Sequence, residues 1–269
     1  MKRGITLALL AALALATSVF PANAIARQEI DPEDFSAVIT NPYFPLSLVG
    51  PKLFIGEETD DEGETVETRL ESRLLPDSIV VDGVTVAVLE ERAYEDGELV
   101  EVALDYFAQH PNGDVYYFGE HVDNYVDGIL DNHDGQWLAG EGDNKAGLFM
   151  PAAPQTGVTL ELEYAPGIAE DMATILSLGE TVDVPAGHFV NCLKTRDFSP
   201  LEPDVEEFKW YCRDVGLTRE EGDGAVLELV SIGGSTTPLM DDEDDEDEAD
   251  GVDDDYAIQP PSTGDGGLR

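Results

Sequence analysis

Apolar and polar residues alternate with a period of two over much of the chain, which is the pattern of β-strands. In residues 100–109, the even positions carry only Val, Leu, Tyr and Ala, whereas the odd positions include Glu101 and Asp105. Leu160, Leu162 and Tyr164 alternate with acidic residues in the same way. An amphipathic helix would not keep this alternation.

Short turn motifs separate these strand-like runs. Gly, Asn or Asp in such motifs supplies the positive φ that tight hairpins need. Five of them fall within 70 residues: Asp61-Glu62-Gly63, Asp82-Gly83, Glu95-Asp96-Gly97, Asn112-Gly113 and Asp127-Gly128. This spacing favours antiparallel strands joined locally over βαβ crossovers.

The pattern predicts a mainly β domain, an antiparallel meander that forms a curved sheet or partial barrel with one short helix. The helix is expected over Gly167–Leu178, where Ile168, Met172, Ile175 and Leu176 would share a face. A lead-in at Arg27–Thr40 should hold one helical turn or an edge strand. Further strands are expected at Glu180–Val184, His188–Phe198, Val205–Arg213 and Ala225–Ile232.

The N-terminus has the features of a secretory signal peptide. Lys2 and Arg3 precede an apolar run, Ile5–Phe20, and Ala22-Asn23-Ala24 offers the small–x–small pattern of a cleavage site. The run is shorter than the roughly 20 residues of a membrane-spanning helix. We therefore expect residues 1–24 to be removed, no membrane span, and a secreted or periplasmic location, although an uncleaved N-terminal anchor is the alternative.

Acidic residues outnumber basic ones 58 to 14, a formal net charge of −44. The segment Asp241–Arg269 is predicted to be a disordered acidic tail, and residues 25–240 to be a single β-rich domain. The tail holds 13 of the acidic residues, so the domain itself is strongly acidic. This charge, with only five Lys, fits a salt-tolerant, halophilic-like surface or the binding of divalent cations. It argues against nucleic-acid partners.

The two cysteines lie in two successive predicted strands, His188–Phe198 and Val205–Arg213. If these strands form a hairpin with Phe198 opposite Glu206, Cys192 faces Cys212 in the same register. Since export leads to an oxidising compartment, we predict a structural disulfide between them.

No sequence motif identifies a catalytic site or a cofactor. Nucleophile-elbow, zinc-protease, phosphate-loop and Cys-x-x-Cys motifs are absent from the sequence. The many acidic loops suggest calcium as a ligand, but the EF-hand registers centred on Gly63, Gly135 and Gly251 each place a non-acidic residue at a ligand position.

Two looser groupings of oxygen ligands stay open beside the simpler reading of solvated acidic loops. One is a calcium site from Asp123, Asp127, Asp131 and Asp134. The other is a divalent-cation site from Glu163, Glu170, Asp171 and Glu202. The four histidines are scattered, and a surface or hairpin-end role is expected for them.

Several motifs resemble a family of uncharacterised secreted bacterial proteins. The resemblance rests on the opening Asn41-Pro42-Tyr43-Phe44-Pro45-Leu46, on Tyr116-Tyr117-Phe118-Gly119-Glu120 and on Pro200-Leu201-Glu202-Pro203, among other stretches between Asn41 and Ile232. It implies one β-rich domain and no particular reaction. Leu53-Phe54-Ile55 departs from the family, which usually has a Trp-x-Tyr strand there, and its members often lack the cysteine pair.

We expect a non-catalytic binding or envelope-associated protein that takes divalent cations or a small apolar ligand on a concave face. Two alternatives stay open: an extracellular hydrolase that uses carboxylates such as Glu163 and Glu202, and a structural or matrix interaction protein.

Overall fold

The computed structural model describes residues 31–59, 63–222 and 224–233. The predicted signal peptide, residues 1–24, and the predicted acidic tail, residues 241–269, lie outside the described residues. The Asp61-Glu62-Gly63 turn lies partly outside them. The described residues are mainly β, as predicted, with one short 3₁₀ helix, η1 (Pro32–Asp34), in the lead-in.

In the described residues, sixteen strands form one antiparallel sheet that does not close. The first eight are β1 (Lys52–Thr59), β2 (Thr65–Leu74), β3 (Ile79–Val81), β4 (Val84–Glu95), β5 (Glu98–Gln109), β6 (Val115–Val126), β7 (Ile129–Asn132) and β8 (Trp137–Leu138). The other eight are β9 (Lys145–Met150), β10 (Thr159–Glu161), β11 (Glu163–Tyr164), β12 (Met172–Val184), β13 (Gly187–Ser199), β14 (Glu202–Cys212), β15 (Gly216–Gly222) and β16 (Ala225–Ile232).

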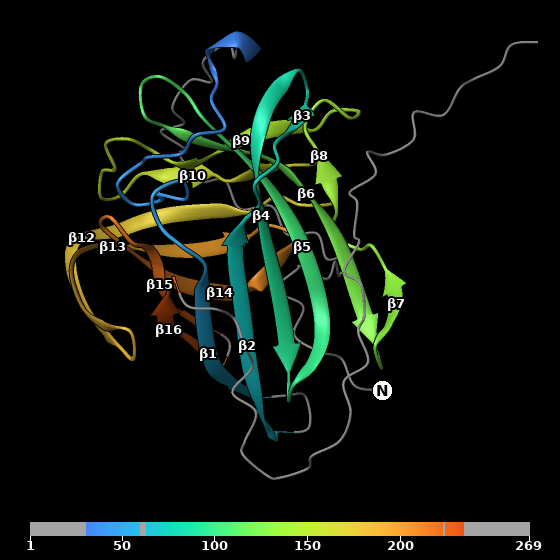
Figure 1. The fold of residues 1–269 in the computed structure, drawn as a ribbon, viewed down its shortest axis with the longest axis vertical. Helices are drawn as coiled ribbons and strands as arrows, with labels where there is room; N and C mark the ends of the chain where they lie inside the picture. Colours follow the sequence, from blue (N-terminus) through green and yellow to red (C-terminus); the bar gives the residue numbers. More distant parts are fainter. Residues whose placement is uncertain (1–30, 60–62, 223, 234–269) are drawn as a thin grey trace, which may run out of the picture. The chain divides into compact units, whose positions relative to one another are not determined.

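The sheet curls so strongly that its two edge strands are neighbours in the chain. Its order runs β10-β12-β13-β14-β15-β16-β1-β2-β4-β5-β6-β9-β11, so β10 and β11 are at opposite edges. Only Leu162 separates these two strands in sequence. Figure 1 shows β1, β2, β4 and β5 side by side, with β12 and β13 turned steeply away from them. The strands therefore surround an interior space.

The predicted hairpin turns lie where strands reverse. The Asp-Gly pairs 82–83, 96–97 and 127–128 join β3 to β4, β4 to β5 and β6 to β7, and all six residues have positive φ. Two successive residues with positive φ match the right-handed twist of the flanking strands. Gly113, with φ of 95°, reverses the chain between β5 and β6.

The predicted helix over Gly167–Leu178 is wrong. Residues 166–168 form a turn, and Met172–Val184 is the long strand β12. Ala173 and Ile175 are buried, whereas Leu176 is exposed, so burial follows a period of two at this point. Pairing with β13 supplies the backbone hydrogen bonds of β12. This long-range pairing outweighs the helix-like spacing of the local apolar residues.

The predicted disulfide and its register are confirmed. Cys192 pairs with Cys212 across β13 and β14, and Phe198 pairs with Glu206 in the same ladder. Both cysteines are fully buried in a small cluster with Val182 and Trp210. A buried disulfide fits a protein that works outside the reducing cytoplasm.

An aromatic cluster forms much of the larger hydrophobic core. The ring of Phe107 lies 4.7 Å from that of Tyr117 and 4.9 Å from those of Phe44 and Phe149. Phe44 belongs to the Asn41–Leu46 motif. The buried Asn41 fixes this motif against the sheet, because its Nδ2 donates to the Gly113 carbonyl at 2.9 Å.

Candidate functional site

A cavity of about 710 Å³ lies inside the curved sheet. Small-molecule sites in proteins have volumes of roughly 300–1,000 Å³. Ten acidic residues line the cavity, together with Lys52, Arg73 and Lys209. The acidic residues are Glu91, Glu101, Asp105, Glu120, Glu163, Asp171, Asp197, Glu202, Glu207 and Glu220.

The wall formed by β4 and β5 turns its acidic face inward. Glu101 and Asp105 are 7% and 8% exposed, whereas Val102 and Leu104, on the other face of β5, are only half-buried. The alternation of β5 is therefore as the sequence indicates, and on its interior face the carboxylates of Glu101 and Asp105 alternate with Ala103 and Phe107. The interior surface is mixed, with carboxylates set among apolar and aromatic side chains.

A β-bulge adds Glu120 to the same wall. Asp105 pairs with Glu120 and Phe107 pairs with Tyr117, so two residues of β6 oppose the single residue between them on β5. A bulge of this kind shifts the alternation of a strand by one. Tyr117 and Glu120 consequently both line the cavity. The Tyr117 hydroxyl donates a buried hydrogen bond of 2.6 Å to Asp105 Oδ1.

Glu163 and Asp171 lie close to the two edge strands, β10 and β11, which follow one another in the chain. The backbone N–H groups of Leu162 and Glu163 donate to the Asp171 carbonyl at 2.8 and 3.2 Å. This contact brings the segment before β12 against β11. Both side chains line the cavity, and Asp171 Oδ1 is buried without a hydrogen-bond partner.

On the opposite wall, Lys209 of β14 lies among three carboxylates. Its Nζ is 3.4 Å from Glu207, 3.8 Å from Glu220 and 3.9 Å from Asp197. Burial alone would lower the pKa of Lys209, but Glu220, Glu207 and Asp197 outweigh it and hold that pKa well above its usual range. Lys209 is therefore a permanent ammonium inside the cavity.

Burial raises the pKa of most cavity carboxyls. The pKa of Glu101 rises to about 7 through burial and the nearby Glu91, and burial raises that of Glu220 to about 7 in spite of Lys209. Burial likewise raises the pKa values of Asp171 and Asp197 to about 6. The pKa of Asp105 is well above its usual range because of burial and its acidic neighbours. Near neutral pH the cavity therefore holds both carboxylates and carboxylic acids.

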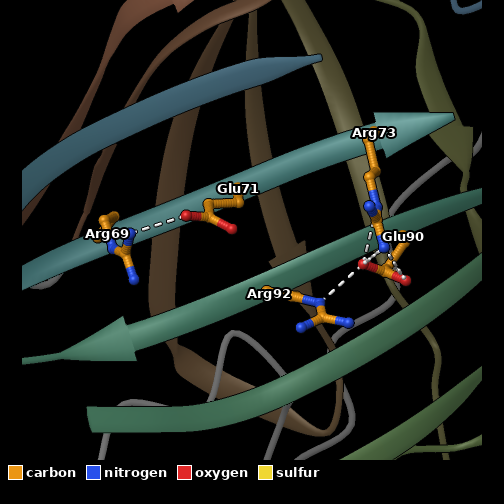
Figure 2. A network of polar contacts seen from close by, with 5 residues as sticks. All are labelled: Arg69, Glu71, Arg73, Glu90 and Arg92. Carbon is orange, nitrogen blue, oxygen red and sulfur yellow. Dashed lines mark hydrogen bonds and ion pairs between the residues drawn. The ribbon is translucent and has the colours of Figure 1, made fainter. Parts of the chain in front are cut away.

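On the outer face of β2 and β4, arginine side chains pair with the acidic residues. Glu90 accepts hydrogen bonds from Arg73 Nε at 3.0 Å and from Arg92 Nε at 2.7 Å, which Figure 2 shows. Burial alone would raise the pKa of Glu90, but the two guanidinium groups lower it overall. Arg69 and Glu71 form a second pair on β2 at 2.7 Å. These arginines pair with acidic residues on the outer face of β2 and β4, although Arg73 also borders the cavity.

Three of the four acids predicted as a cation site line the cavity, and the fourth does not. Glu163, Asp171 and Glu202 are cavity residues. Glu170 instead accepts a hydrogen bond of 2.8 Å from the Gly167 N–H in the turn before β12. The set does not converge on one point, because its donor atoms form no cluster of three within 4.8 Å.

The second predicted grouping is dispersed as well. Asp127 forms the tip of the β6–β7 hairpin, and the Asp131 carboxylate accepts a hydrogen bond from Asn132 Nδ2. Asp123 instead lies between two histidine rings. Within residues 31–59, 63–222 and 224–233, His121, Asp123 and His133 form the one group of three potential metal ligands whose donor atoms all lie within 4.8 Å.

Sequence reasoning missed Glu91, Glu101, Asp105 and Lys209 as cavity residues. A signal was present, because Glu101 and Asp105 share one strand face with Ala103 and Phe107. Acidic and large apolar residues on one face indicate a buried polar surface rather than a solvated one. Lys209 likewise shares one strand face with Glu207 and Tyr211, two positions away on either side.

No protein-family model, curated protein or solved structure significantly matches the chain. The resemblance through the Asn41–Leu46 motif stays a prediction. The structure gives this motif a position: Phe44, Pro45 and Leu46 line the cavity. None of the helices in the described residues is long and apolar enough to cross a membrane.

Proposed function

We propose that this chain is a non-catalytic binding protein, exported to the periplasm or the medium, that holds a small organic cation in its interior cavity. The observation that carries this proposal is the excess of carboxyl groups in the cavity, ten against three basic side chains. A diamine or triamine with a short apolar chain has the matching charge and surface.

Unsatisfied carboxyl oxygens support a cationic ligand. Glu101 Oε2, Asp171 Oδ1 and Asp197 Oδ1 are buried and have no hydrogen-bond partner. A buried carboxyl oxygen without a partner costs free energy, and an ammonium N–H would remove that cost. On the wall formed by β13, β14 and β15, Lys209 already supplies such an ammonium group to Glu207 and Glu220. The β4–β5 wall lacks such a group within hydrogen-bonding distance of Glu101 Oε2.

The spacing of the carboxyl groups favours an elongated organic cation over a single metal ion. Metal–oxygen distances of about 2.0–2.6 Å require several oxygens close together. The cavity carboxyls of the described residues contain no group of three within 4.8 Å. Phe107, Tyr117 and Tyr211 also line the cavity. Their rings can cover methylene groups and attract an ammonium group.

The proposal can be tested by titrating the full-length mature protein with spermidine, a linear triamine, in a calorimeter. We expect saturable binding near pH 8, weaker binding near pH 5 where the raised carboxyls are protonated, and proton uptake by the buffer on binding. Glu101→Gln should weaken binding at least about tenfold, since one charge-assisted hydrogen bond is lost.

Glu90→Gln is the matched control, because Glu90 belongs to the neighbouring strand but lies on the outer face with Arg73 and Arg92. It should leave the spermidine affinity unchanged. The proposal is wrong if both substitutions weaken spermidine binding equally, or if NaCl of the same ionic strength gives the same heat. Either result would show that spermidine binds only to the acidic surface.

A carboxylate-dependent hydrolase is the second candidate. Glu163 and Asp171 line one cavity from adjoining segments, an arrangement in which one carboxyl can donate a proton while the other accepts one. Turnover of chromogenic glycosides or esters that is lost in Glu163→Gln, with the fold intact by circular dichroism, would favour the hydrolase. Spermidine binding without turnover favours the binding protein.

A further inference from the structure

Two histidines and an aspartate meet on the β6–β7 hairpin. His121 Nε2 lies 3.3 Å from Asp123 Oδ1, and His133 Nδ1 lies 2.8 Å from the same oxygen. The imidazole centroids are 5.4 Å apart, and the ring planes are 34° from parallel. His121 and Asp123 are two positions apart on β6, so they project from the same face of the strand.

The hairpin backbone holds His133 in this position. Asn124 Nδ2 donates to Asn132 Oδ1 at 2.9 Å and to the Asp134 carbonyl at 3.2 Å. The Asp134 N–H in turn donates to Asn132 Oδ1 at 2.8 Å. These hydrogen bonds fix the chain on both sides of His133 against β6. The donor group is thus positioned by the hairpin before any ligand arrives.

The distances suit one small metal ion. Zinc binds imidazole nitrogen and carboxylate oxygen at about 2.0–2.2 Å, so two ligands of a tetrahedral ion lie about 3.3 Å apart. The 3.3 Å between His121 Nε2 and Asp123 Oδ1 matches that value, whereas the 2.8 Å between His133 Nδ1 and the same oxygen is a hydrogen-bond distance that must lengthen slightly around an ion. The imidazole side chains are 44% exposed and that of Asp123 is 27% exposed, so an ion has access from solvent.

We propose that His121, Asp123 and His133 form a binding site for a divalent transition-metal ion, with Zn²⁺ as the representative ion. Two imidazoles and one carboxylate suit zinc, copper, nickel and iron(II), whereas calcium prefers an all-oxygen set. His133 Nδ1 also lies 2.8 Å from the Val122 carbonyl, so without metal its N–H serves that carbonyl and Asp123. On binding, the ring proton moves to the other nitrogen and the Nδ1 lone pair faces the ion.

This site is independent of the interior cavity. His121 and Asp123 are absent from the cavity lining, and so is His133. A purely structural reading is that both rings donate hydrogen bonds to Asp123 and hold the hairpin together. The two readings differ in what they predict for added metal.

The experiment is calorimetric titration of the mature protein with ZnCl₂, followed by Co²⁺ absorption spectroscopy. We expect one tight site per chain, loss of at least roughly 100-fold in affinity in His121→Gln and in His133→Gln, and a similar loss in Asp123→Asn. An excess of Ca²⁺ should not displace the metal, because imidazole is a poor calcium ligand.

His110→Gln and His188→Gln are the matched controls. His188 forms a two-membered pair with Asp183 at 2.6 Å, and His110 packs against Phe35. Neither arrangement supplies three donors, so neither substitution should change the tight site. Equal Zn²⁺ affinity in all five variants and the parent, or displacement of Zn²⁺ by Ca²⁺, would leave only diffuse attraction to an acidic surface and overturn the proposal.

Discussion

Glu90 and Glu91 are neighbours in β4, but their carboxyl groups meet opposite surroundings. Glu90 lies between Arg73 and Arg92 on the outer face, where the guanidinium groups lower its pKa against the effect of burial. Glu91 faces the cavity, where burial raises its pKa although Ser72, Lys209 and Lys52 oppose the shift. The alternation of a strand therefore separates a permanently charged acid from one that titrates nearer neutrality.

Deprotonation of Glu101 should make the fold less stable as pH rises. Burial raises its pKa from 4.5 to about 7, so the folded state binds a proton that the unfolded state has lost over this window. The free energy of unfolding should consequently fall between about pH 4.5 and about pH 7, by an amount on the order of 3 kcal/mol for this group. Urea unfolding measured across that range tests the sign.

Glu101→Gln removes this titration and should flatten the pH profile, with its gain in stability over the parent largest above about pH 7. Glu90→Gln should instead lower the free energy of unfolding, and most so at neutral pH. The lowered pKa of Glu90 contributes stability that is present at neutral pH and lost on acidification. If the parent's free energy of unfolding instead rises between pH 4.5 and 7 relative to that of Glu101→Gln, the assignment is contradicted.

At the scale of elements, the bulge in β6 is the feature that combines Tyr117 and Glu120 on one face. It depends on Gly119, which has a φ of 117° and no room for a side chain, since a Cβ would clash with the Trp137 carbonyl oxygen. Gly119→Ala should destabilise the fold by about 3 kcal/mol or more, because both backbone strain and a clash are introduced. Thermal and urea unfolding measure the loss.

Gly128→Ala is the matched control for the bulge. Gly128 also has a positive φ, 71°, but nothing lies within 4 Å of a Cβ built there. It should cost only about 1 kcal/mol, the strain of a left-handed alanine. If both substitutions cost the same, the close approach of Trp137 has no energetic role.

Local pattern was sufficient for most elements of the sheet and insufficient for the site. Residues 100–109 and the Cys192–Cys212 hairpin follow from alternation and turn chemistry, which act over a few residues. The Gly167–Leu178 helix was wrong because pairing of β12 with β13 is a long-range effect. The sequence signals a buried polar face on β5, but not the cavity itself, because the cavity depends on which face of each strand the curl of the sheet encloses.

At the scale of the molecule, the charge of −44 sets how stability responds to salt. Carboxylates on the outer surface repel one another, and the Debye length falls from about 10 Å at 0.1 M to about 3 Å at 1 M salt. We expect the melting temperature of the mature protein to rise steadily over that range of NaCl. Differential scanning calorimetry measures the rise.

Spermidine and Zn²⁺ act differently from NaCl, because each stabilises through a saturable site at a constant ionic strength. Their effects should be reduced in Glu101→Gln and His133→Gln respectively, while the response to NaCl persists in both variants. A melting temperature that does not change with NaCl would mean that repulsion among the acidic residues on the surface does not limit stability.

The pairing of β1 with β16 also determines when the sheet can form. Lys52 lies beside Ile232 in that ladder, so strands from the two ends of the domain are neighbours in its middle. Contacts between residues so far apart in sequence slow folding, because the loop between them must close first. A ribosome-bound or partly translocated chain that lacks β16 has no partner for one side of β1. Its folding is therefore delayed until nearly the whole domain is available.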